Sequence, residues 1–134
     1  MARILIAEDE ADLARLVQRV MEGESHQVTT VRDGAAASHA LVSRSYDLLI
    51  VDIVMQVIDG VALALKASES FPALRIIIIT GYRAELERAR NLGALIHSVL
   101  AKPFTPEALR AAAAKALAGE SLAGDAPGQG FTTE

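Results

Sequence analysis

The sequence predicts an α/β fold in which a five-stranded parallel sheet lies between two layers of helices. Short runs rich in Ile, Leu and Val alternate five times with helical patterns along the chain, which is typical of such sheets. Two of the runs show little polar alternation, as expected for strands covered on both faces. Because right-handed crossovers leave few topologies, we expect a (βα)5, flavodoxin-like sandwich with strand order 2-1-3-4-5.

The strands are predicted from short apolar runs bounded by polar or turn-forming residues. A fifth run, Ser98–Ala101, is weaker than the other four. The four stronger runs are interpreted as buried strands and span Ile4–Ala7, Gln27–Val31, Leu48–Val51 and Leu74–Ile79.

Helices are predicted between these runs from apolar residues at helical spacing. In the first helix, one face is formed by Leu13, Leu16, Val17, Val20 and Met21. The last helix begins with a capping residue followed by proline at the first helical position, in Thr105-Pro106-Glu107, and runs to about Leu117. The three helices in between are expected over Gly34–Ser45, Val61–Ser70 and Arg83–Leu92, with Asp59-Gly60 interpreted as a turn before the second of them.

Length and composition indicate one domain over residues 1–119 and a disordered tail over residues 120–134, which are rich in Gly, Ser, Thr and Asp. The chain has 134 residues and no cysteine, so disulfides and thiolate metal sites are excluded. A net charge of −4 gives no reason to expect nucleic acid or an anionic membrane as a partner. Because neither a signal peptide nor a membrane span is recognisable, we expect a cytoplasmic protein.

The chemically informative residues follow the predicted strands, because ligands of such sheets bind beyond the carboxyl ends of the strands. Three acids, a hydroxyl and an amine are predicted to meet at this edge. The residues concerned are Glu8 and Asp9 after the first strand, Asp52 after the third, Thr80 and Gly81 after the fourth, and Lys102 and Pro103 after the fifth.

This set of residue types indicates phosphoryl chemistry on a carboxylate. Three crowded carboxylates repel one another, and a hard divalent cation such as Mg²⁺ relieves the repulsion. Asp52 is the candidate nucleophile toward a phosphoryl donor. The Lys102 ammonium, the Thr80 hydroxyl and Mg²⁺ would stabilise the negative charge of the transferring group.

In order and placement, these residues resemble the signature of the receiver domains of two-component signalling, from Ala2 to about Leu117. The motifs that carry the resemblance are Glu8-Asp9, the segment from Asp52 to Gly60, Thr80-Gly81 and Lys102-Pro103-Phe104. A narrower similarity, carried by Asp-Ile-Val-Met, Ile-Thr-Gly-Tyr and Val-Leu-Ala-Lys-Pro-Phe, is to CpdR-type single-domain regulators, which steer regulated proteolysis.

The resemblance implies a site. Mg²⁺ would be bound by Asp9, by Asp52 and by the backbone carbonyl of Val54, with Glu8 assisting through water. The resemblance also implies that Thr80, Gly81 and Lys102 contact the phosphate and respond to it as part of the switch. It further implies a structural cis peptide bond between Lys102 and Pro103.

The sequence also departs from the family pattern. Gln56 occupies a position that is usually proline, and Val99 replaces an aromatic residue that often reports the active state. Tyr82, two residues after Thr80, is a candidate substitute for that ring. Val54 and Tyr82 would flank the phosphoryl group, shield it from water and so modulate its lifetime.

The resemblance implies a signalling switch rather than an enzyme. A histidine kinase or a histidine phosphotransfer protein would supply the phosphoryl group, and a downstream protein would bind the face formed by the fourth helix, fifth strand and last helix. One alternative is an adaptor that works without phosphorylation, which Gln56 and Val99 keep open. An aspartyl-phosphate phosphatase would want a second Asp at Val54, and an FMN-binding module would want Ser, Thr and Gly in place of Glu8-Asp9-Glu10.

Overall fold

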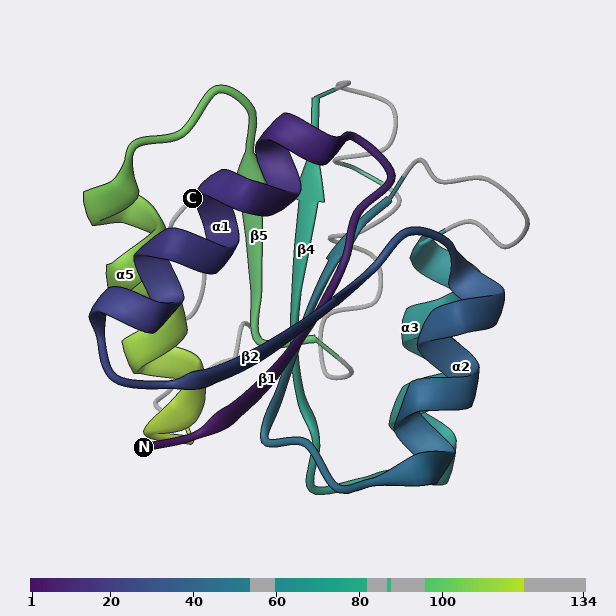
Figure 1. The fold of residues 1–134 in the computed structure, drawn as a ribbon. Coiled ribbons are helices and arrows are strands. Elements are labelled where there is room, and N and C mark those ends of the chain that lie inside the picture. The colour runs from purple at the N-terminus through teal and green to yellow at the C-terminus, as the bar shows by residue number, and fades with distance from the viewer. Residues whose placement is uncertain (54–59, 82–86, 88–95, 120–134) are drawn as a thin grey trace.

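The computed structural model describes residues 1–53, 60–81, 87 and 96–119. All the strand pairs in it are parallel, and the sheet has the order β2-β1-β3-β4-β5 (Figure 1). The predicted fold class and strand order are therefore confirmed. The strands are β1 (Arg3–Ala7), β2 (Gln27–Val31), β3 (Leu48–Asp52), β4 (Arg75–Thr80) and β5 (Ser98–Ala101).

Helices cover both faces of the sheet. One face is covered by α1 (Ala11–Gly23) and α5 (Pro106–Leu117), and the opposite face by α2 (Gly34–Ser43) and α3 (Gly60–Ser70) (Figure 1). The predicted helix over Arg83–Leu92 lies, apart from residue 87, outside the described residues, and so does the predicted tail over 120–134. Within the described ranges, none of the helices has the length and apolar character needed to cross a membrane.

Two of the helices begin where the sequence places a capping residue. The Thr105 side chain accepts a hydrogen bond from the backbone N–H of Ala108 at 3.0 Å, with Pro106 at the start of α5. The Asp33 side chain accepts one from the N–H of Ala36 at 2.8 Å and so caps α2. These caps fix the direction in which each helix leaves the end of the sheet.

The aliphatic core lies in two layers, one on each face of the sheet. Both layers draw on the central strands, and β3 is buried at all of its residues. This burial pattern explains the continuous apolar runs, because a central parallel strand packs against helices on both sides. Burial of this extent is the main source of stability for the rigid framework that holds the strand ends.

The interpretation of Gln27–Val31 as a buried strand is wrong. β2 lies at the edge of the sheet, and its residues are exposed or half-buried. An edge strand has a neighbour on only one side, so its polar Thr29 and Thr30 side chains face water. The placement of Leu16 on the core face of α1 is also wrong, since Leu16 is 40% exposed and the helix buries Val17, Val20 and Met21 instead.

Candidate functional site

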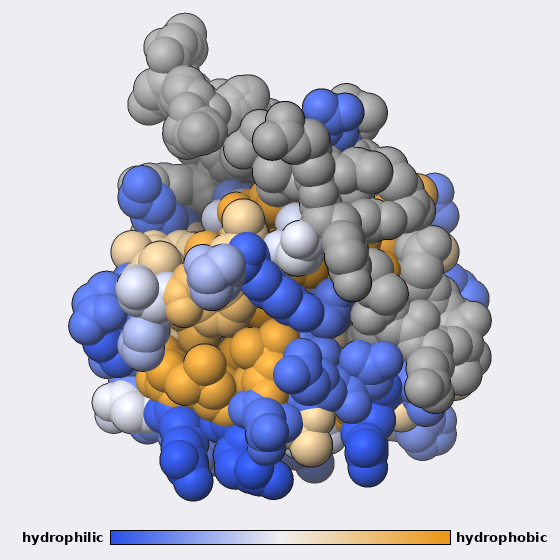
Figure 2. All heavy atoms as spheres, turned by 90° about the horizontal axis from the view of Figure 1, so that it is seen from above, coloured by the Kyte–Doolittle hydropathy of each residue, from blue (hydrophilic) through white to orange (hydrophobic). Residues whose placement is uncertain are grey.

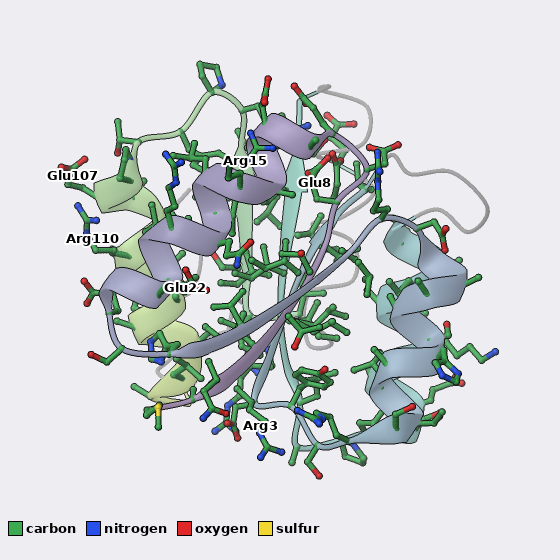
Figure 3. The ribbon with its side chains drawn as sticks, in the orientation of Figure 1. Arg3, Glu8, Arg15, Glu22, Glu107 and Arg110 are labelled. Carbon is green, nitrogen blue, oxygen red and sulfur yellow. The ribbon has the colours of Figure 1, made fainter. Side chains whose placement is uncertain are left out.

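The parallel register brings the predicted site residues to one end of the sheet. Asp52 is the last residue of β3 and pairs with Ile79 of β4, while Thr80 pairs with Ala101, the residue before Lys102. Glu8 follows β1 at the same end, where Figure 3 shows it beside the start of α1. The space-filling view onto this end shows hydrophilic side chains around an apolar area (Figure 2).

An acidic cluster forms at this end. Carboxylate oxygens of Glu8, Asp9 and Asp52, one from each residue, lie within 4.8 Å of one another. Glu8 and Asp52 are only 2% and 4% exposed, whereas Asp9 is half-buried. Two buried carboxylates and a third beside them concentrate negative charge where water solvates it poorly, and this is the donor set that hard divalent cations prefer.

Glu8 has one buried carboxylate oxygen whose hydrogen bonding is unsatisfied by the described residues. Its Oε2 atom accepts a hydrogen bond from the backbone N–H of Glu10 at 3.0 Å, but its buried Oε1 atom has no hydrogen-bond donor among the described residues. Burial raises the pKa of Glu8 to about 8, and the neighbouring Asp52 carboxylate acts in the same direction. A cation bound at Oε1 would supply the missing partner and favour the ionised form.

Lys102 provides the positive charge of the site. Its Nζ atom donates a hydrogen bond to Oδ2 of Asp52 at 2.9 Å, and the two side chains are 30% and 5% exposed. Partial burial alone would lower the pKa of Lys102, but the bond to Asp52 and the charges of Glu8 and Glu10 raise it above its ordinary value. The ammonium group therefore stays charged next to Asp52.

Thr80 and Gly81 connect the ends of β4 and β5. Thr80 is buried, and its carbonyl oxygen accepts a hydrogen bond from the backbone N–H of Lys102 at 2.7 Å. Gly81 lies beside the Lys102 side chain, since a Cβ added at residue 81 would be 3.5 Å from Lys102 Cδ. The peptide bond between Lys102 and Pro103 is cis, as the resemblance to receiver domains implied. Thr80 and Lys102 thus flank the site from adjacent strands.

The residues predicted to modulate the site are only partly covered by the structure. Val99 is a half-buried residue of β5 that packs against the core cluster on the α2–α3 face. Val54, Gln56 and Tyr82 lie outside the described residues, so the shielding predicted for Val54 and Tyr82 remains a prediction.

One residue of this end was missed by the sequence reasoning, which assigned Gly60 only to a turn. Gly60 is the first residue of α3, and its backbone N–H donates a hydrogen bond to the carbonyl oxygen of Ile53 at 2.8 Å. The available signal was a glycine directly before a predicted helix. Glycine costs backbone entropy on folding and is the usual residue where another backbone approaches closely.

The fold and these groups together define a class of protein, the α/β domains that present an acidic cluster and a lysine at the carboxyl ends of a parallel sheet. The sequence model of the response regulator receiver domain matches residues 4–114. The chain belongs to the family of response-regulator receiver domains, whose members are signalling proteins of two-component systems.

Individual relatives agree with this assignment. The response regulator receiver protein CpdR of Brucella abortus is 38% identical over 104 residues, which cover 78% of this chain and 87% of CpdR. The transcriptional regulatory protein TctD of Salmonella typhimurium is 32% identical over 109 residues, and there the alignment spans 81% of this chain but only 49% of TctD. The crystal structure of the response regulator TrrA from Thermotoga maritima, in complex with Mg²⁺ and BeF, is 26% identical with a TM-score of 0.79 and covers 86% of this chain and 98% of TrrA.

Proposed function

We propose that this receiver domain is a switch that accepts one phosphoryl group on Asp52 and signals through protein–protein contact. The observation that carries the proposal is the buried Asp52 carboxylate, which lies beside Glu8 and Asp9 and pairs with Lys102 at 2.9 Å. A carboxylate held in this way is a candidate nucleophile, and the Lys102 ammonium beside it would stabilise the negative charge of a phosphoryl group. The two neighbouring acids would contribute by holding a cation.

In the proposed transfer, a carboxylate oxygen of Asp52 forms a bond to phosphorus as the phosphorus–nitrogen bond of a donor phosphohistidine breaks. The imidazole of a histidine kinase or a histidine phosphotransfer protein leaves and takes up a proton. Lys102 and the Thr80 hydroxyl would then contact phosphate oxygens. The product is a stoichiometric acyl phosphate, so the chain acts as a phosphate acceptor rather than as a turnover enzyme.

Mg²⁺ is the proposed cofactor, and the residues present fit it. Glu8 Oε1 is a buried oxygen without a donor among the described residues, and Glu8 contributes one carboxylate oxygen to a cluster whose oxygens lie within 4.8 Å of one another. Asp9 and Asp52 would bind the ion directly and Glu8 would assist. The ion would neutralise charge on the phosphoryl group during transfer. TrrA, which shares the fold, was crystallised with Mg²⁺ and BeF, and this supports the choice of ion.

The partners are proposed as classes of protein rather than as individual proteins. The donor would be a histidine kinase or a phosphotransfer protein, and the downstream protein would bind the face that includes β5 and α5. Control of regulated proteolysis is supported by the similarity to the protein named CpdR. Neither a nucleic acid nor a membrane surface is proposed as a partner, because the net charge of −4 offers no attraction to either.

The test is phosphorylation by acetyl phosphate, followed by intact-mass measurement. The parent protein should gain one phosphate when Mg²⁺ is present and none when it is chelated. Asp52→Ala should gain none, because the nucleophile is absent. Asp9→Asn should lose the Mg²⁺-induced changes in amide signals, whereas Asp12→Asn, which removes an exposed acid of α1, should keep them. Full labelling of Asp52→Ala would overturn the assignment, and a parent that is never labelled would favour the phosphorylation-independent adaptor.

A further inference from the structure

Gly60 approaches the backbone of the acceptor residue more closely than any side chain would allow. A Cβ atom added at residue 60 would lie 2.3 Å from the carbonyl oxygen of Asp52, 2.5 Å from Cα of Ile53 and 2.9 Å from the carbonyl carbon of Asp52. All three neighbours are backbone atoms, so no rotamer change relieves the overlap. The first turn of α3 therefore rests directly on the peptide unit that joins Asp52 to Ile53.

Two hydrogen bonds hold the backbone of Ile53, the residue that follows the acceptor. The N–H of Gly60 donates to the carbonyl oxygen of Ile53 at 2.8 Å, and the N–H of Ile53 donates to the carbonyl oxygen of Ile79 in β4 at 2.9 Å. Ile53 itself is 1% exposed, so its side chain is fixed in the core. The backbone that carries the Asp52 side chain is thus held between β4 and the start of α3.

We propose that Gly60 is a positioning residue for Asp52, and that its missing side chain sets where the acceptor carboxylate stands relative to Lys102 and the acidic cluster. This inference rests on the proposed function, because it assigns Gly60 a part in Mg²⁺ binding and phosphoryl transfer at Asp52. A side chain at residue 60 would push α3 and the Asp52–Ile53 peptide apart. The carboxylate would then move relative to Lys102 Nζ, which lies at 2.9 Å.

A positioning role for Gly60 predicts a reciprocal effect of Mg²⁺ on the parent protein. If the link from Gly60 to Ile53 favours the arrangement of Asp52 that binds Mg²⁺, then Mg²⁺ must favour the link by the same factor. A glycine that served only to pack α3 would carry no such coupling. Mg²⁺ would then leave the opening of the link unchanged.

The first experiment compares Gly60→Ala with two controls in the full chain. In Gly23→Ala the added Cβ has nothing within 4 Å, so this control reports the effect of a glycine substitution alone. Leu41→Ala removes a buried side chain of α2 and reports the effect of lowered stability. The readouts are the dissociation constant of Mg²⁺ and the maximal phosphorylation rate at saturating acetyl phosphate, measured where every variant is folded.

We expect Gly60→Ala to lower the maximal rate by about tenfold or more, because displacements of this kind misalign a nucleophile. Its Mg²⁺ affinity should weaken as well, while both controls keep the parent values. Parent-like rates in folded Gly60→Ala would overturn the inference and leave the assignment of Asp52 intact. Equal losses in Leu41→Ala would also overturn it, because they would show a general effect of lowered stability. An unlabelled parent would instead reject the proposed function.

The second experiment needs no variant, so it tests the positioning role of Gly60 even if Gly60→Ala does not fold. Amide hydrogen exchange at Gly60 is followed in the parent with and without Mg²⁺. We expect Mg²⁺ to slow exchange of the Gly60 N–H by about tenfold, because the ion stabilises the link to Ile53. The N–H of Ala108, which donates to the Thr105 side chain in the first turn of α5, serves as the internal reference. An unchanged Gly60 exchange rate would overturn the inference.

Discussion

The two ends of the sheet differ in how their polar groups are paired. At the amino end, backbone N–H groups find side-chain acceptors from the neighbouring segment. The N–H of Ala2 donates to Nδ1 of His26 at 3.0 Å, and the N–H of Ile76 donates to Nδ1 of His97 at 3.1 Å. Both histidines precede an edge strand, so each closes the ladder where that strand begins. This end is arranged for stability.

At the carboxyl end, by contrast, charged groups are buried, and Glu8 Oε1 has no hydrogen-bond donor among the described residues. The buried polar residues of the described core, Glu8, Asp52 and Thr80, all lie at this end. Figure 3 shows Arg3 and Glu8 at opposite ends of β1, the first at the paired end and the second in the acidic cluster. The contrast teaches that the burial of charged groups is concentrated at the carboxyl end, which is the end that carries the proposed Mg²⁺ and phosphoryl site.

Removing the lysine should give the largest effect on stability. Lys102→Met leaves the buried Asp52 carboxylate beside Glu8 with no cation, so we expect the metal-free protein to lose about 3 kcal/mol of unfolding free energy. Urea unfolding at neutral pH in a chelator measures the change. Lys66→Met, which removes an exposed lysine of α3, should change little.

A double variant sharpens this result. Combining Lys102→Met with Asp52→Asn should recover most of the lost stability, because the unpaired charge is then gone. A double variant no more stable than Lys102→Met would mean that Lys102 acts through packing rather than through its charge.

The buried Glu8 should give the next largest effect, and one that depends on pH. Its folded-state pKa of about 8 lies above the ordinary value of 4.5, so the unfolded state releases this proton first as pH rises. The metal-free protein therefore loses stability from about pH 5 to about pH 8, and Glu8→Gln removes that loss. At pH 8.5 we expect Glu8→Gln to be more stable than the parent by about 2 kcal/mol. Parallel stability profiles for parent and variant would contradict the prediction.

The framework of the fold was readable from the sequence because it depends on local patterns. Apolar runs and capping residues predicted the order of the elements, and α5 begins at Pro106 as expected. The errors concern the environment of an element rather than its type. The apolar pattern predicts a buried strand at Gln27–Val31 although the predicted strand order places that strand at an edge, and helical spacing predicts Leu16 on a face that the helix does not bury.

The sequence predicted which residues form the site but not how well their polar atoms are paired. Topology alone predicted that Glu8, Asp52 and Lys102 would meet at the carboxyl end of the sheet, and the structure places them there. Which oxygen lacks a donor is set by distances of a few tenths of an ångström, and no residue pattern encodes them. The close approach of Gly60 to Asp52 was missed for the same reason, because it joins segments whose spacing is decided by packing.

The amino end should give the smallest effect and no dependence on Mg²⁺. His26→Ala removes the acceptor of the Ala2 N–H, a part-buried group, so we expect a loss of about 1 kcal/mol. Because His26 lies at the opposite end of the sheet from the acidic cluster, the loss should be equal with and without Mg²⁺. Phosphorylation by acetyl phosphate should proceed at the parent rate. Paired urea unfolding curves in Mg²⁺ and in chelator measure both quantities. A loss that differs between the two conditions would show that the ends of the sheet are coupled, and the separation argued from their hydrogen bonds would be wrong.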